Sequence, residues 1–183
     1  MSAVLEFETT NGKYQRVSVI IHWLTVLLMV AIYASIEIHQ ELQRGTTLRR
    51  LTEDWHIYLG LTLIPIVIYR ALVILRSPIP PIIPAQANWE RLAVKLMKAY
   101  LYVLMLGMPL LGWLFLSAEG HAVSWFGIPL PAIAPESDGL AEAAEELHEV
   151  LGQSGYVFIT LHALAGLYHH YIRKDNTLKR MTL

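Results

Sequence analysis

Two histidines, His148 and His162, lie fourteen residues apart in a stretch long and apolar enough to cross a bilayer. On an α-helix, fourteen residues fall about 40° short of four full turns and rise about 21 Å. Such a helix presents both imidazoles on one face, one near each side of a membrane. Ionisable side chains within lipid mark functional sites, and imidazole is a common axial ligand of haem iron. The spacing predicts two stacked haems, each taking one ligand from this helix; two unrelated packing histidines are the alternative.

The composition is that of an integral membrane protein. Of the 183 residues, 55% are hydrophobic and 16% are charged, and the mean hydropathy is +0.43, which is far from the average of soluble domains. The absence of cysteine excludes disulfides, iron–sulfur clusters, thiolate ligands and covalent c-type haem attachment. Residues 1–16 lack the basic start and short apolar run of a cleaved signal peptide, so the first hydrophobic segment is expected to be retained.

Four stretches are long enough to span about 30 Å of hydrocarbon. They are residues 17–38, 55–75, 92–116 and 148–172. The sequence therefore predicts an all-α fold, an integral membrane four-helix bundle that forms a single transmembrane domain over residues 1–183. Pro65 and Pro109 fall inside the second and third spans, where neighbouring helices can satisfy the freed carbonyls, so kinks rather than breaks are expected.

The basic residues predict the orientation. In a four-span layout, one side of the membrane has only Arg44, Arg49 and Arg50, and the other side has the remaining eleven of the fourteen Lys and Arg residues. Positive charge favours the cytoplasmic side. Both termini are therefore expected to be cytoplasmic, and the three arginines are expected to face the outside.

This orientation gives each histidine within the spans a depth. His56 and His148 fall in the outer half, and His22 and His162 fall in the inner half. Each pair joins two different spans at comparable depth, which predicts two bis-histidine sites for haem b. His169 lies about two turns past His162 on the same face and is an alternative partner for His22. His162 is favoured, because a glycine follows it one turn later and His169 is expected to lie at the rim of the bundle.

Glycine recurs at a fixed offset from three of these histidines. The glycines one helical turn later are Gly60, Gly152 and Gly166. A position without a side chain allows a porphyrin to lie close to the helix backbone, as it allows close approach between membrane helices. We therefore expect these glycines to face the haems, with ordinary helix contacts as the alternative.

Several segments resemble one family, the bacterial diheme cytochrome b561 family, and within it the small membrane superoxide oxidases. They are residues 20–23 (IIHW), 55–60 (WHIYLG), 78–84 (PIPPIIP), 155–158 (GYVF) and, as the longest and most specific, 169–181 (HHYIRKDNTLKRM). The resemblance covers about residues 14–181. It implies a multi-pass protein of the bacterial inner membrane that takes electrons from superoxide outside and passes them through two b haems to ubiquinone. The haem ligands that it implies are His22, His56, His148 and His162.

One position departs from the family pattern. Many relatives are expected to carry a histidine at the start of the third span, where this chain has Lys98. If that histidine serves the quinone or a haem propionate, its role has moved or is lost. A lysine can still pair with a propionate, so the haems need not be affected.

Three arginines precede His56 and break the positive-inside bias. Arg44, Arg49 and Arg50 fall in the short loop that leads into the second span. Superoxide is an anion, and a cationic cluster raises the local concentration and association rate of anions. Steering of superoxide is therefore one reading. The other is that these arginines bind lipid phosphates or the loop's own carboxylates.

The inner site needs protons as well as electrons, because reducing a quinone to a quinol takes two of each. His169 is the best placed proton donor, and Lys98 is the alternative. Arg70 and Arg76 are candidates to neutralise haem propionates, or they snorkel to the cytoplasmic headgroups. The identity of the quinone, ubiquinone or menaquinone, is left open by the residues.

Three functions are compatible with these features. The first is an autonomous superoxide:quinone oxidoreductase. The second is a cytochrome b electron-relay subunit of a larger complex, of the hydrogenase or formate dehydrogenase type; the short external loops offer little docking surface for it. The third is a haem-free metal transporter, which would need acidic residues at mid-membrane depth in the first three spans. The expected partners are membrane lipid, superoxide, quinone and a possible second copy of the chain, with no nucleic acid.

Overall fold

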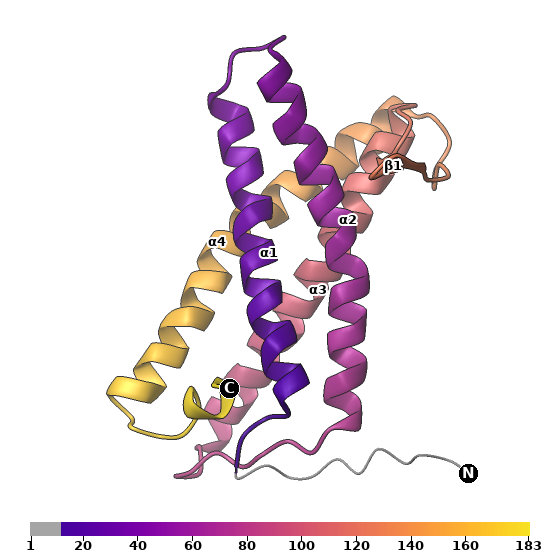
Figure 1. Cartoon of the computed structure of the whole chain (residues 1–183). Coiled ribbons are helices and arrows are strands. Elements are labelled where there is room, and N and C mark those ends of the chain that lie inside the picture. Colours follow the sequence, from indigo (N-terminus) through magenta and orange to yellow (C-terminus); the bar gives the residue numbers. More distant parts are fainter. Residues whose placement is uncertain (1–11) are drawn as a thin grey trace, which may run out of the picture.

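The computed structural model describes residues 12–183 as four long helices in an up-and-down bundle (Figure 1). The helices are α1 (Arg16–Glu41), α2 (Thr47–Arg76), α3 (Asn88–Ala118) and α4 (Asp138–Tyr171). All four are long and apolar enough to cross a membrane. The predicted all-α membrane bundle is therefore confirmed. The expectation about a signal peptide concerns mainly residues 1–11, which lie outside the described range.

Two helices begin well before their apolar stretch. α2 starts at Thr47 rather than at residue 55, and α4 starts at Asp138 rather than at residue 148. Each start has a side-chain cap: the Thr46 hydroxyl accepts a hydrogen bond from the Arg49 amide (3.3 Å), and the Ser137 hydroxyl accepts one from the Leu140 amide (3.4 Å). Hydropathy detects the membrane-embedded part of a helix and misses such polar extensions.

The prolines do not break their helices, and the outer loop contains a feature that was not foreseen. Pro65 and Pro109 lie inside continuous helices. The α3–α4 connection forms a small antiparallel hairpin of β1 (Ser124–Trp125) and β2 (Ile128–Pro129). Its two turn residues both have positive φ, 48° at Phe126 and 83° at Gly127, as a tight two-residue hairpin requires.

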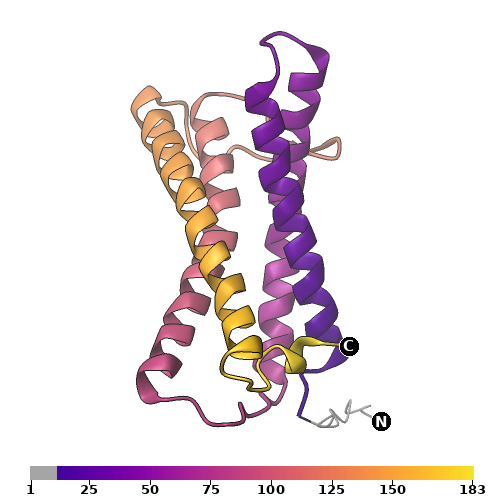
Figure 2. The ribbon, with the colours of Figure 1, turned by 90° about the vertical axis from the view of Figure 1, so that its left-hand side faces the viewer.

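The helices pack as two hairpins that lie side by side (Figures 1 and 2). α1 packs along α2, α3 packs along α4, and α2 joins the hairpins through α3. The buried core between the first three helices consists of Leu28, Leu63, Val67 and Met105. α4 shares few backbone contacts with α1 or α2. α4 therefore packs against these two helices through its side chains.

The carboxyl-terminal tail, residues 172–183, closes one end of the bundle. This end, called the inner end below, also holds the start of α1 and the α2–α3 connection (Figure 2). The Asn176 amide group accepts a hydrogen bond from the Ile83 backbone (2.8 Å) and donates one to the Pro81 carbonyl (3.2 Å). The Trp23 indole donates to the Met181 carbonyl (3.0 Å). The long motif at the end of the sequence thus ties three chain segments together.

A tight contact between α1 and α4 gives a first test of the packing. A methyl group added at Gly155 would clash with the Tyr33 hydroxyl, which donates a hydrogen bond to the Gly152 carbonyl (2.9 Å). We expect Gly155→Ala to displace Tyr33 and to lower the free energy of unfolding by about 1–3 kcal/mol. Thermal unfolding in detergent, followed by circular dichroism, measures this loss.

Gly139 provides the control for this variant. It lies in the same helix, and an added methyl group would meet nothing within 4 Å. Gly139→Ala is expected to be neutral or slightly stabilising, since alanine has the higher helix propensity. Equal melting temperatures for the Gly155→Ala variant and the unchanged protein would contradict the contact.

Candidate functional site

The structure brings four histidines together in two pairs, both of which use α4. His22 of α1 faces His162, with ring centroids 6.4 Å apart. His56 of α2 faces His148, with ring centroids 6.2 Å apart. These are the two pairings expected from depth and topology, and the rings are steeply inclined to one another, at 79° and 74°.

Both separations fit an iron atom between two imidazoles. A ring nitrogen coordinates a first-row metal at about 2.0–2.1 Å, and the ring centre lies roughly 1.1 Å beyond it, so two axial imidazoles have centres about 6.3 Å apart. The His56 Nδ1 atom lies 3.1 Å from the Ile32 carbonyl oxygen, which orients the ring and leaves Nε2 available as a ligand. The arrangement is suited to bis-imidazole haem ligation at two depths.

The glycines near these histidines have different surroundings. Methyl groups added at Gly60 or Gly166 would meet no protein atom within 4 Å, so both positions can admit a flat group. Gly152 packs instead against the Met108 methyl group, 3.4 Å from an added Cβ, so here the helix-contact alternative applies. Sequence reasoning missed Gly112 of α3, where an added Cβ would lie 3.2 Å from the His148 ring.

The cations expected at the inner pair differ in their placement. Arg70 is a charged neighbour of both His22 and His162, and its guanidinium lies 5.7 Å from the centre of the Tyr102 ring. Lys98 is a charged neighbour of His162. Arg76 is exposed at the end of α2. Arg70 and Lys98 are therefore placed to act on the inner site, and the surroundings of Arg76 fit snorkelling.

His169 is buried rather than placed at the rim of the bundle. It is 8% exposed, and its Nδ1 atom lies 2.5 Å from the Oδ2 atom of Asp175, which is 2% exposed. The expectation that His169 sits at the rim was wrong, because the tail turns back after Tyr171 and covers it. His169 also has its own partner, which leaves His162 opposite His22.

The partner carboxylate is held in its ionised form. Burial raises the pKa of Asp175, but hydrogen bonds from Thr177 and from the His169 imidazole outweigh it, and the net pKa lies below the ordinary value of 3.8. A depressed pKa of an acid stabilises the folded form above that value, and the contribution is lost as the pH falls below it. The tail is therefore expected to stay docked at neutral pH and to loosen only in strong acid.

The three outer arginines do not act as one loop cluster. Arg49 and Arg50 lie in the first turn of α2, so their assignment to the loop was wrong. The Arg49 guanidinium donates hydrogen bonds to the carbonyls of His39 (2.8 Å) and Leu42 (2.9 Å) at the end of α1. Arg44 and Arg50 are exposed, and neither is ion-paired within residues 12–183.

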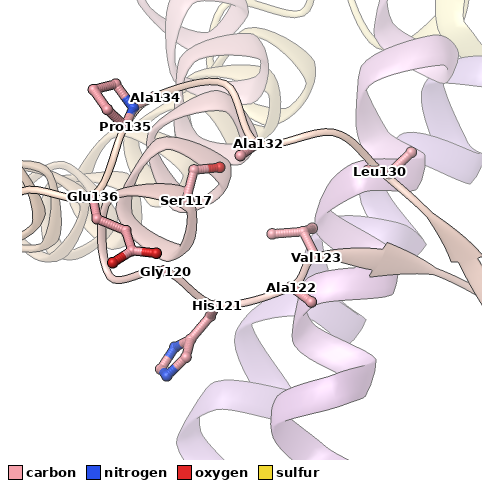
Figure 3. Close-up of a pocket in the computed structure, with 10 residues that line it drawn as sticks. All are labelled: Ser117, Gly120, His121, Ala122, Val123, Leu130, Ala132, Ala134, Pro135 and Glu136. Atoms are coloured by element: carbon pink, nitrogen blue, oxygen red, sulfur yellow. The ribbon is translucent and has the colours of Figure 1, made fainter.

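A surface cavity in the outer loop lies apart from the histidine pairs, and its lining includes one acidic side chain, Glu136. It has a volume of about 490 Å³ at the outer end of α3 and is lined by Ser117, His121 and Glu136 among others (Figure 3). A smaller cavity of about 180 Å³ includes Glu53 and Asp54. These carboxylates would repel an anion.

A membrane bundle with paired imidazoles at two depths belongs to the class of membrane b-type cytochromes. Residues 13–183 match the family model described as prokaryotic cytochrome b561, and the chain belongs to that family. It is accordingly a multi-pass protein of the bacterial inner membrane that binds b-type haem. The resemblance found in the sequence is confirmed.

Three relatives show how far the similarity extends. "Probable superoxide oxidase CybB" of Yersinia pestis is 33% identical over 93% of this chain and 96% of its own length. "Cytochrome b561 homolog 1" of Escherichia coli (strain K12) is 31% identical over 93% of this chain and 97% of its own. "Cytochrome b561 homolog 2" of the same organism is 29% identical over 97% and 95%.

Proposed function

We propose that this cytochrome is a superoxide:ubiquinone oxidoreductase with two b haems and cytoplasmic termini. The observation that carries the proposal is the pair of imidazole separations, 6.4 Å and 6.2 Å, at two depths along one helix. Two such sites provide a route for electrons across most of the bilayer. The similarity to a probable superoxide oxidase supports superoxide as the donor.

In this proposal His22 and His162 hold the inner haem, and His56 and His148 hold the outer haem. When bound, the haem iron supplies the one-electron chemistry. The chain fixes the ligands: the Ile32 carbonyl orients His56, and Gly112 makes room for His148. The His56–His148 pair lies nearer the outer end, and the His22–His162 pair lies nearer the tail.

Superoxide needs no proton removed, so the outer end has only to attract an anion. We expect the double variant Arg44→Gln, Arg50→Gln to lower the rate constant for reduction of the haems by superoxide by about threefold to tenfold at low ionic strength. Stopped-flow absorption at several salt concentrations measures the rate. The difference between the variant and the unchanged protein should shrink as salt rises.

Arg76 and Arg91, exposed at the inner end, are the matched controls. The variant Arg76→Gln, Arg91→Gln changes the net charge by the same amount but leaves the outer end intact, so its rate should stay unchanged. Equal rates for the two double variants at low salt would rule out steering by Arg44 and Arg50.

Quinone reduction at the inner end requires a proton donor, and the buried His169 imidazole is proposed for that role. The test of the proposed function is to mix the oxidised, purified protein with superoxide and ubiquinone and to follow haem absorption and quinol formation. A haem-reduction rate no faster than that of heat-inactivated protein would reject the oxidase proposal and leave the relay-subunit alternative. His169→Ala is expected to stop quinol formation while haem reduction by superoxide continues.

A further inference from the structure

Arg70 is a charged side chain inside a membrane helix. It lies about 9 Å along the helix axis from the last residue of α2, Arg76. Its Nε atom is buried without a hydrogen-bond partner, and no ion pair of Arg70 is found within residues 12–183. An unpaired guanidinium at this depth is costly, and arginines in such positions pair with an anion or line a functional site.

A second hydrogen-bond donor, which also lacks an acceptor, lies beside Arg70. The Arg70 guanidinium is 5.7 Å from the centre of the Tyr102 ring, and the Tyr102 hydroxyl is buried without a partner. Guanidinium and phenol are both hydrogen-bond donors in this setting, and no acceptor from the described chain satisfies either. Two adjacent donors without an acceptor specify a ligand that brings acceptor oxygens and negative charge, and a carboxylate fulfils both demands.

The position of this pair relates it to the inner histidines. Arg70 is a charged neighbour of both His22 and His162. Each helix thus gives one residue to this place: His22 from α1, Arg70 from α2, Tyr102 from α3 and His162 from α4. The carboxylates that a haem b brings to such a site are its propionates.

The two ends of the bundle differ in their buried polar atoms that lack a hydrogen-bond partner. The buried side-chain polar atoms without a partner belong to Ser18, His22, Arg70, Gln86, Tyr102, His148, His170, Thr177 and Arg180. Of these residues, His148 alone belongs to the outer pair, and the others lie on the inner side of the bundle. The charged neighbours of the inner histidines include Arg70 and Lys98, whereas those of His56 include Glu53.

We propose that Arg70 and Tyr102 form a carboxylate clamp that holds a propionate of the inner haem within the bundle and makes the inner haem the easier of the two to reduce. This inference rests on the proposed function only in its two haems; it needs neither superoxide nor quinone. Positive charge near a haem favours the reduced state, so electrons that enter at the outer haem move inward.

Redox titration of the purified, haem-loaded protein with chemical mediators tests the clamp. Arg70→Gln and Tyr102→Phe are each expected to shift the midpoint potential of the more easily reduced haem to lower values and to leave the other haem unchanged. Arg76→Gln, which removes an exposed charge from the same helix, should shift neither. Midpoint potentials of both clamp variants equal to those of Arg76→Gln would overturn the clamp.

Binding of haem to the apoprotein provides a second measurement. Loss of one charge-assisted hydrogen bond is expected to weaken binding at the inner site by about tenfold or more. Tyr102→Phe removes a single hydroxyl, so this variant remains informative if Arg70→Gln does not fold. Unchanged haem affinity together with a raised KM for quinone would overturn the clamp in favour of a quinone contact. A wild-type protein that binds one haem would instead refute the proposed function.

Discussion

Replacing His148 with alanine is expected to leave a protein that binds one haem in place of two. The outer pair would lose its α4 member, and His56 would face the site alone from α2, with its ring still oriented by the Ile32 carbonyl. His162 lies about 21 Å further along α4, so the inner pair should keep its geometry. The haem-to-protein ratio of purified material, measured by pyridine haemochrome absorbance, should fall from about two to about one.

The same variant should lose its reaction with superoxide while remaining reducible by a chemical reductant. Electrons enter at the outer site in the proposed function, so removal of a ligand of that site should reduce the rate by about a hundredfold or more, since even the loss of a partner that only orients a metal ligand costs about tenfold to a hundredfold. His121, an exposed histidine of the outer loop, supplies the control His121→Ala, which should retain both haems. Two haems per chain in the His148→Ala variant would refute the assignment.

The histidine pairs could be anticipated because they follow from periodicity and topology alone. A fourteen-residue spacing fixes a face and a rise on any helix, and the charge bias fixes which histidines share a depth. In a bundle of membrane helices, these two facts leave little freedom in how the histidines pair. The structure accordingly places His22 opposite His162 and His56 opposite His148.

Other features depend on contacts between segments that are distant in the sequence, and a local sequence pattern does not reveal such contacts. Arg49 reads as a free loop cation in the sequence, but the first turn of α2 brings it back to the last carbonyls of α1. The contact between His169 and Asp175 requires the tail to reverse after α4 ends. The steric need for glycine at residue 155 comes from Tyr33, which lies on a different helix.

The second large effect is expected for a substitution beside the buried imidazole of His169, at the inner end of the bundle. The Asp175 carboxylate accepts a hydrogen bond from His169 Nδ1, which fixes the orientation and the tautomer of the ring. Asparagine has the same shape but no charge, and its amide can present a donor to the ring. We expect Asp175→Asn to slow quinol formation by about tenfold to a hundredfold, while the rate of haem reduction by superoxide stays unchanged.

A purely structural role for Asp175 predicts a different result, and the state of the tail separates the two. If Asp175 only holds the tail, its loss should increase proteolysis of residues 172–183, and quinol formation should fall only in step with that loss of protection. If Asp175 acts through the His169 imidazole, quinol formation should fall while the tail stays protected, and Asp175→Glu, which keeps a carboxylate, should recover most of the rate. Asp138→Asn, at the exposed start of α4, is the control. Tail proteolysis that accounts for the whole loss of quinol formation in the Asp175→Asn variant would exclude His169 and Asp175 as the proton-delivering pair.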